Sequence, residues 1–122
     1  MELISKEDFI RNQNDRDIVR KTAQQVIKDF GLFGIDINFP EDLKMAYDDL
    51  FDQLTIIVAE LLGSKASKLY TILYQIDLSE VAIQKGVAEM KDHTLNDVIT
   101  HLILERELKK VLTREFIKKG KL

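Results

Sequence analysis

The residue types that could do chemistry gather near the start of the last helix that the sequence predicts. Asp97, His101 and Glu105 follow one another at intervals of four, which places them along one ridge of a helix, and His93 precedes them by the same interval. Two carboxylates and an imidazole are suitable ligands for a divalent metal. The chain has no Glu-x-x-His pair, however, and carboxylate-bridged di-iron bundles need two of them. We therefore favour His101 as a histidine at the edge of the core or of an interface, hydrogen-bonded to Asp97 or Glu105, and expect no metal or other cofactor.

Signatures of catalysis do not accompany these residues. The sequence contains no Gly-x-Gly-x-x-Gly, no P-loop, no Gly-x-Ser-x-Gly and no His-Glu-x-x-His. The absence of cysteine also excludes a cysteine nucleophile, a thiolate zinc site and disulfides. Tyr70 and Tyr74 could line a ligand pocket, but tyrosines four apart are more typical of a core with hydroxyls at its rim. We predict that the protein is not an enzyme.

The composition limits the classes of partner. The 122 residues are 45% hydrophobic and 32% charged, with a net charge of -3, which is typical of one globular domain without a strong attraction to nucleic acid or anionic lipid. Apolar runs are far shorter than the ~20 residues of a membrane span, and the first residues do not form a secretory signal. We expect a cytoplasmic protein that binds neither nucleic acid nor membrane.

The most informative stretch is a helix predicted over residues 94–119. It has two apolar stripes where a surface helix needs one. The first stripe contains Leu95, Val98, Ile99, Leu102 and Ile103, and the second contains Leu104, Leu108, Val111 and Leu112. We expect this helix to be enclosed on both sides, either by other helices of its own chain or by a second copy.

Helical spacing and capping residues predict the other elements. We expect a short helix over residues 6–12, a helix from Asp15 or Asp17 to Phe30 ended by Gly31, and a long helix from Pro40 to residue 62. Two shorter helices follow, one capped by Ser64 or Ser67 and one started by an Asp77–Glu80 capping box that runs to residue 90. The fold class is all-α, an antiparallel bundle of four main helices plus an N-terminal helical segment. We assign a single domain over residues 1–122, in which residues 1–39 are a helix with an extended connector and residues 40–122 are the bundle.

Residues 32–39 show a different pattern, because Ile35, Ile37 and Phe39 alternate with small or polar residues. A single strand without a partner is not stable. We therefore interpret this segment as an extended connector that buries its three apolar side chains against the helices. The alternative is that it pairs with its own copy across a dimer, since an unpaired extended edge is a template for another chain.

The charges are distributed unevenly. Six acidic residues accompany one lysine in residues 41–60, whereas seven basic residues accompany two acidic ones in residues 106–122. This asymmetry predicts that the acidic start of the first long helix lies beside the basic end of the last one. It is explained equally well by the dipole of each helix, which favours acids at its N-terminus and bases at its C-terminus.

Two segments carry a resemblance: residues 69–80 (LYTILYQIDLSE) and residues 105–114 (ERELKKVLTR). They are similar to small, uncharacterised all-helical bacterial proteins. The resemblance covers about the C-terminal half of the chain and implies helices in a bacterial cytoplasm, with no activity, cofactor or catalytic residue attached.

Our leading hypothesis is a non-enzymatic helical protein that self-associates, as a dimer, through its last helix. The expected interface residues are Leu104, Leu108, Val111 and Leu112, together with Ile35 and Ile37 of the connector. The first alternative is a small regulatory or adaptor module that binds a helix of another protein. The second alternative is a helical bundle that binds a ligand or a metal between its helices.

Overall fold

The computed structural model of the protein describes residues 15–120. Its regular structure is helical throughout, and the all-α prediction is confirmed. The elements are α2 (Arg16–Gly31), the short 3-10 helix η1 (Leu43–Met45), α3 (Ala46–Ser64), α4 (Ala66–Gln75), α5 (Glu80–Glu89) and α6 (Leu95–Lys118). The helix predicted over residues 6–12 lies outside the described residues.

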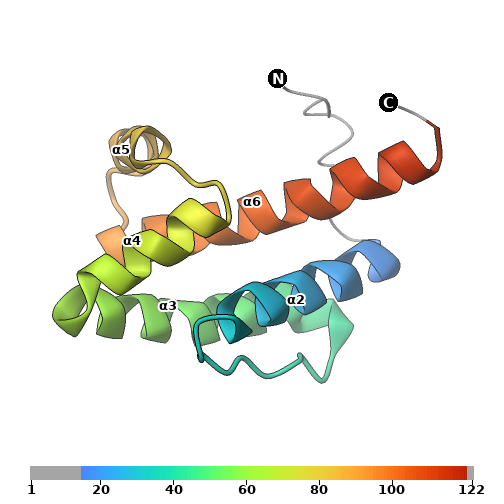
Figure 1. Cartoon of the computed structure of the whole chain (residues 1–122), viewed down its shortest axis with the longest axis horizontal. Coiled ribbons are helices and arrows are strands. Elements are labelled where there is room, and N and C mark those ends of the chain that lie inside the picture. The colour runs from blue at the N-terminus through green and yellow to red at the C-terminus, as the bar shows by residue number, and fades with distance from the viewer. Residues whose placement is uncertain (1–14, 121–122) are drawn as a thin grey trace.

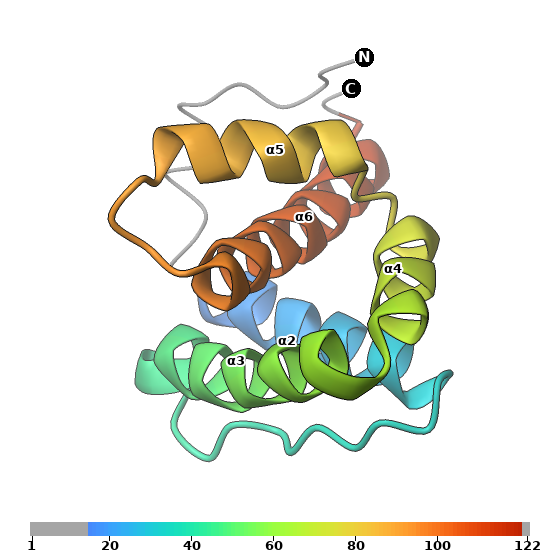
Figure 2. The same ribbon diagram turned by 90° about the vertical axis from the view of Figure 1, so that its left-hand side faces the viewer.

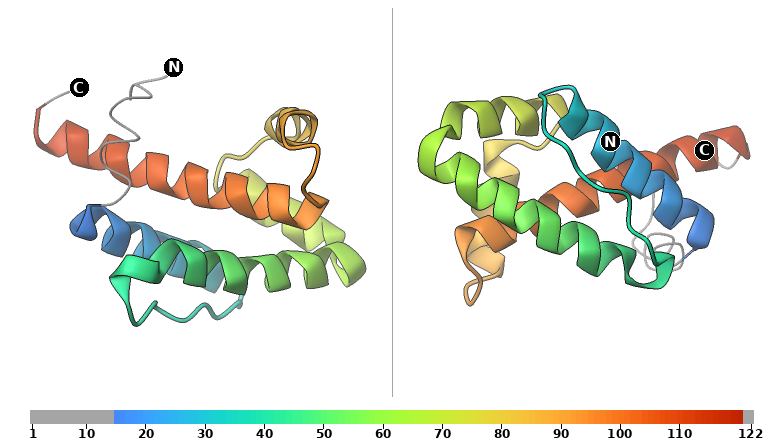
Figure 3. Two further views of the ribbon diagram at one scale, coloured as in Figure 1. Left: turned by 180° about the vertical axis from the view of Figure 1, so that it is seen from behind. Right: turned by 90° about the horizontal axis from the view of Figure 1, so that it is seen from below.

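The long helix α6 occupies the middle of the molecule (Figures 1 and 2). α2 and α3 lie next to each other on one side of α6, and α5 crosses over its other side, while α4 closes one end (Figure 2). The views from behind and from below show the same order of layers (Figure 3). α6 contacts α2, α3 and α5 directly. The enclosure predicted from its two apolar stripes is therefore supplied by helices of the same chain.

The core has two parts, both built on α6. The larger part is formed by apolar residues of α2, α3, α4 and α6 and includes Phe30, Leu50, Leu54, Ile72, Ile99 and Ile103. The smaller part lies where the start of α2 meets the second half of α6, and it consists of Ile18, Leu108, Val111, Leu112 and Phe116 with Tyr47 packed against it. From the first stripe of α6, Ile99, Leu102 and Ile103 contribute to the larger core, whereas Leu95 is exposed. From the second stripe, Leu108, Val111 and Leu112 form part of the smaller core, whereas Leu104 packs against the larger one.

Side-chain caps begin three of the α-helices, α2, α5 and α6. The carboxylate of Asp15 accepts hydrogen bonds from the backbone N–H groups of Asp17 and Ile18, and Thr94 accepts one from Asp97, as the sequence predicts for both ends. The prediction that Asp77 caps α5 is wrong, because Ser79 is the N-cap. Asp77 instead has a φ of 66° in the turn after α4, a left-handed conformation that aspartate tolerates better than most residues.

Two helix ends differ from the prediction. Pro40 does not start a helix, because Asp42 caps the short turn η1 and α3 begins only after it. Gly31 is still helical, and the glycine with a left-handed φ, of 76°, is Gly34 in the following turn. Both corrections have one cause: proline at a helix start and glycine after a helix end are tendencies that local hydrogen bonds override.

The connector begins with a turn over residues 32–34, and residues 35–39 have no regular secondary structure, so no strand forms within the described residues. The prediction that the whole of residues 32–39 is extended is therefore wrong for residues 32–34. The side-chain amide of Gln53, from α3, forms two hydrogen bonds with the backbone of the connector, as a neighbouring strand would. Its Oε1 accepts from the N–H of Asn38 at 2.9 Å, and its Nε2 donates to the carbonyl of Asn38 at 2.9 Å. Ile37 is buried and Ile35 is half-buried, but Phe39 is 43% exposed, so the prediction that all three are buried is wrong for Phe39.

Candidate functional site

The candidate metal ligands are not brought together. Asp97 accepts a hydrogen bond from the hydroxyl of Thr55 at 3.0 Å, and Glu105 forms an ion pair of 3.6 Å with Lys109. No group of three or more potential metal ligands forms within residues 15–120. His101 instead packs against aromatic rings, with its centroid 4.7 Å from that of Phe51 and 5.9 Å from that of His93. His101 therefore lies at the edge of the packed helices, where its ring lines a groove.

The predicted interface residues have different surroundings. Leu108, Val111 and Leu112 are buried within a single chain, against the start of α2 and Tyr47 of α3. The prediction that these three contact a second copy is corrected, because the same chain already covers them. Ile37 is likewise part of the core. Leu104 and Ile35 are half-buried, and of these two Leu104 lines a groove.

The groove has a volume of about 600 Å³ and lies between α3, α6 and the loop that joins α5 to α6. We call it the apolar groove, because its floor consists of Tyr47, Phe51, Met90, Leu102, Leu104 and Leu108. Asp48, His101 and Glu105 supply its polar atoms. Burial raises the pKa of Tyr47 to about 12, and the neighbouring Thr22 hydroxyl opposes this effect only in part. Tyr47 therefore stays neutral and acts as an aromatic wall.

A chain of polar side chains crosses the interface between α2 and α6. Arg114 donates to Oε1 of Gln25 at 2.6 Å, and Nε2 of Gln25 donates to Asp29 at 2.9 Å. Lys110 then donates to the other oxygen of Asp29 at 2.8 Å and lies 2.9 Å from Oε1 of Glu107. We call these five residues the α2–α6 polar chain. It fixes which face of α6 meets α2.

Glu107 is the most unusual member of this chain, because its side chain is 0% exposed. Its contact with Lys110 is close but is not an aligned hydrogen bond, and neither of its oxygens accepts one within the described residues. Burial, followed by the proximity of Asp29, raises the pKa of Glu107 to about 8, although Lys110 opposes this. Burial also acts to raise the pKa of Asp29, but contacts with Glu107 and Lys110 outweigh it and the pKa is lowered. At neutral pH the pair therefore holds one proton, on Glu107.

The second half of α6 forms ion pairs with α2. Lys21 of α2 donates to Glu115 at 2.7 Å, which raises the pKa of Lys21 and lowers that of Glu115. Lys110 pairs with Asp29 in the same interface. Within the described part of the chain these are the ion pairs that join the second half of α6 to another long helix. The predicted pairing of this basic end with the acidic start of α3 is therefore corrected, and its partner is α2.

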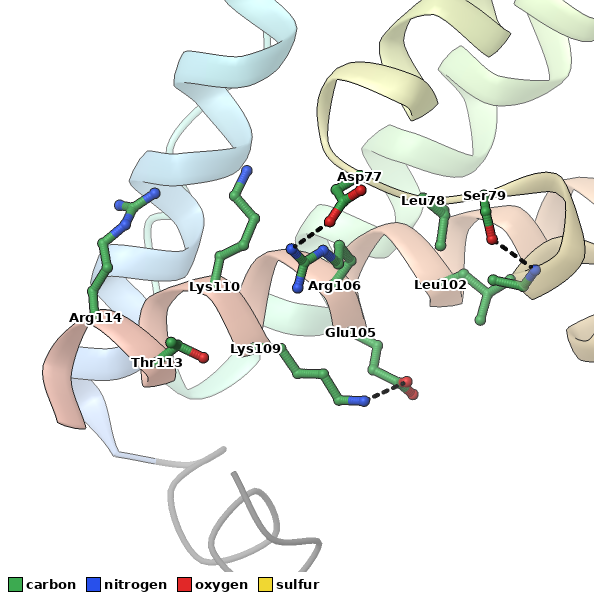
Figure 4. Close-up of a pocket in the computed structure, with 11 residues that line it drawn as sticks. Asp77, Leu78, Ser79, Leu102, Glu105, Arg106, Lys109, Lys110, Thr113 and Arg114 are labelled. Carbon is green, nitrogen blue, oxygen red and sulfur yellow. Dashed lines mark hydrogen bonds and ion pairs between the residues drawn. The ribbon is translucent and has the colours of Figure 1, made fainter. Parts of the chain in front are cut away.

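A second cavity, of about 610 Å³, lies along α6 from the start of α5 to Arg114 (Figure 4). We call it the basic cavity, because four cations of α6 line it: Arg106, Lys109, Lys110 and Arg114. The guanidinium of Arg106 holds the turn before α5, donating to the carbonyl of Ile76 at 3.2 Å and to Asp77 at 3.3 Å. Figure 4 shows Lys110 and Arg114 directed toward α2, whereas Lys109 and Glu105 point away from it. The cavity is suited to an anion.

The sequence predicted that these cations lie beside the acidic start of the first long helix or complement the helix dipole, and it did not predict the polar chain. One feature of the sequence did indicate the polar chain, the position of Glu107. Glu107 lies four residues after Ile103 and four before Val111, in the middle of an apolar face of the predicted helix. A carboxylate at such a position is buried unless the helix bends away, and a buried carboxylate needs partners.

The described helices include none with the length and hydropathy that a membrane span requires. Comparison of the chain with protein-family models, with curated proteins and with solved structures gives no match.

Proposed function

We propose that this is a non-enzymatic helical protein that self-associates through α6. In this proposal the apolar groove of one copy receives the C-terminal end of α6 of another copy. The observation that carries the proposal is the match between these two surfaces of one chain: an apolar groove with acidic residues at its edge, and an exposed apolar residue among lysines.

The groove has the composition of a binding surface. Aromatic residues and methionine are enriched at the centres of protein interfaces, and the floor of the groove contains Tyr47, Phe51 and Met90. Asp48 and Glu105 place two carboxylates at the groove. A segment that combines an apolar side chain with flanking cations is therefore the preferred occupant.

The end of α6 supplies such a segment. Ile117 is 57% exposed, and the exposed residues Lys118 and Lys119 follow it directly. Insertion of Ile117 into the groove removes apolar surface from water at both sites, and the two lysines then lie near Asp48 and Glu105. A reciprocal exchange of these ends between two copies closes the assembly as a two-fold dimer.

The test is sedimentation velocity over a wide range of protein concentration. We expect the wild-type chain to shift from monomer to dimer as its concentration rises, and Ile117→Asp to stay monomeric. Ile56→Asp is the matched control, because Ile56 is 60% exposed on α3 and does not line the groove. We expect this control to dimerise like the wild type. A wild-type chain that is monomeric throughout, or equal effects of both substitutions, would overturn the proposal.

A charge exchange tests the orientation of the two surfaces. Asp48→Lys should weaken association, and so should the double variant Lys118→Glu/Lys119→Glu, because each places like charges opposite each other. The chain that combines all three substitutions should associate again. Failure to regain association, with each chain folded by circular dichroism, argues against contact between these residues.

A further inference from the structure

We propose that the basic cavity binds the phosphate group of a small organic phosphate, with Arg114 as the central contact. This inference does not rest on self-association, because Arg114 does not line the apolar groove, although Leu102 and Glu105 line both hollows. Three features of the cavity support this site: the position of its cations, the carboxylates that neutralise some of them, and its apolar end.

The cations come from one face of α6. Arg106, Lys110 and Arg114 follow at intervals of four, and Lys109 stands beside them. They line the cavity against two carboxylates, those of Asp77 and Glu105, in a chain whose net charge is negative. A hollow lined by one sign of charge concentrates the electric field and attracts small ions of the opposite sign.

The charge of Arg114 is the least compensated of the four. Lys110 pairs with Asp29, Arg106 with Asp77, and Lys109 has Glu105 as an ion-pair partner. Arg114 donates instead to the neutral amide oxygen of Gln25. This bond uses one N–H group and orients the guanidinium without cancelling its charge.

A second hollow increases the positive potential at Arg114. It has a volume of about 230 Å³, shares Arg114 with the basic cavity, and is also lined by Lys21, Lys28 and Lys118. One carboxylate lines it, that of Glu115. Arg114 therefore lies between two basic hollows, and an anion bound to it is attracted from both sides.

The far end of the basic cavity is apolar and indicates the rest of the ligand. Leu78, Ala82 and Leu102 line it where α5 begins. The volume of about 610 Å³ lies in the range of small-molecule sites. Leu102 lies twelve residues before Arg114, about 18 Å along α6, so a ligand with its phosphate on Arg114 reaches this apolar end only if its body is long and extended. We favour phosphate over carboxylate because a planar guanidinium binds phosphate oxygens in pairs, and neighbouring lysines add to a higher charge.

Isothermal titration calorimetry with phenyl phosphate, inorganic phosphate and benzoate tests the proposal. We expect phenyl phosphate and inorganic phosphate both to bind, because each presents phosphate oxygens to Arg114, and benzoate to bind most weakly because it carries less charge. The affinity for phenyl phosphate should fall as salt is added, as expected for an ionic contact near the surface.

Arg114→Gln is the decisive variant, and it should weaken phenyl phosphate binding by about tenfold or more, as expected for the loss of a charged hydrogen-bond donor. Lys85→Gln is the control, because it removes an exposed cation of α5 that does not line the cavity. Urea denaturation of both variants shows whether each is folded. Lys109→Gln provides a second cavity variant should Arg114→Gln prove unstable.

Three results would overturn the proposal: no binding of phenyl phosphate up to about 10 mM, equal weakening in the cavity variants and in Lys85→Gln, or benzoate binding as tightly as phenyl phosphate. Repeating the titration with Ile117→Asp separates this proposal from self-association. That variant should bind phenyl phosphate like the wild type, whether or not the wild type dimerises.

Discussion

Gly86 of α5 lies so close to Leu102 of α6 that a Cβ on residue 86 would stand 3.0 Å from Cδ1 of that leucine. It would also stand 3.1 Å from Cγ1 of Val98. Glycine inside a helix costs ~1 kcal/mol relative to alanine. At residue 86 the absence of a Cβ allows α5 to pack closely on α6, which offsets the lower helix propensity of glycine.

Substitution of two helical glycines by alanine tests this contact. Gly63→Ala, in the last turn of α3, should stabilise the protein by ~0.5–1 kcal/mol, because no other atom lies within 4 Å of the added Cβ. Gly86→Ala should show no such gain and instead lower the free energy of unfolding by up to ~2 kcal/mol, since overpacking outweighs the gain in helix propensity. Urea denaturation measures both. Equal stabilisation by the two changes would contradict tight packing between α5 and α6.

The stability of the protein should depend on the protonation of Glu107. Its pKa is raised from 4.5 to about 8, so between these values the folded chain holds a proton that the unfolded chain has lost. The free energy of unfolding should therefore fall as pH rises from about 4.5 to about 8, by at most ~1.4 kcal/mol per pH unit, and level off above that range. Asp29 acts outside this window, because its pKa is lowered from 3.8.

Glu107→Gln should remove this pH dependence, because glutamine stays neutral. We expect the variant to have nearly constant stability between pH 5 and pH 8 and to be more stable than the wild type at pH 9, in urea denaturation at each pH. Glu105→Gln, at a carboxylate that is 52% exposed, is the control and should keep the wild-type slope. A wild-type stability that rises over this range would show that Glu107 is not buried as a neutral acid.

Substitution of Lys110 should lower the free energy of unfolding, because Lys110 is the cation beside the buried acids Asp29 and Glu107. Lys110→Met leaves Asp29 and Glu107 at the α2–α6 interface without their cation and should destabilise the protein by ~3 kcal/mol. Asp29→Asn should destabilise the Lys110→Met chain less than it destabilises the wild type, because it removes the carboxylate that Lys110→Met leaves unpaired. A double-mutant cycle of unfolding free energies measures this coupling, expected at ~0.5–3 kcal/mol. Additive effects would mean that the two residues do not interact.

The side chain of Gln53 should control the mobility of the connector. Gln53→Ala removes both hydrogen bonds to the backbone of Asn38, and hydrogen exchange at the amide of Asn38 should accelerate. The free energy of unfolding of the whole protein should fall by only ~1 kcal/mol, because water replaces these hydrogen bonds at an exposed site. Gln84→Ala, on the exposed face of α5, should leave exchange at Asn38 unchanged. An unchanged exchange rate at the amide of Asn38 in Gln53→Ala would contradict the hydrogen bonds between Gln53 and Asn38.

The sequence predicts the helices well where two independent signals agree. α6 has dense apolar spacing and a Thr94 cap, and α2 has both an apolar face and Asp15. Prediction fails at two helix starts where the only signal was a local capping pattern. Pro40 and Asp77 each matched a statistical preference for a helix start, yet the hydrogen bonds of neighbouring residues decided where η1 and α5 begin.

The candidate sites were only partly accessible from the sequence. Leu104, Leu108, His101 and Glu105 were singled out for two separate reasons, and the structure places all four on the apolar groove. The basic cavity could not be predicted, because the spacing of cations on α6 does not say which helix faces them. That information lies in the packing of α2, where Asp29 meets Lys110 across 81 residues of sequence.

The central position of α6 has a consequence for synthesis on the ribosome. α2 to α5 emerge first, but the helix that covers their apolar faces is the last of the described helices to be made. The nascent chain therefore exposes Phe30, Leu54 and Ile72 to water or to chaperones until α6 leaves the exit tunnel. Fragments that stop before Leu95 should aggregate, since nothing within them replaces the missing helix.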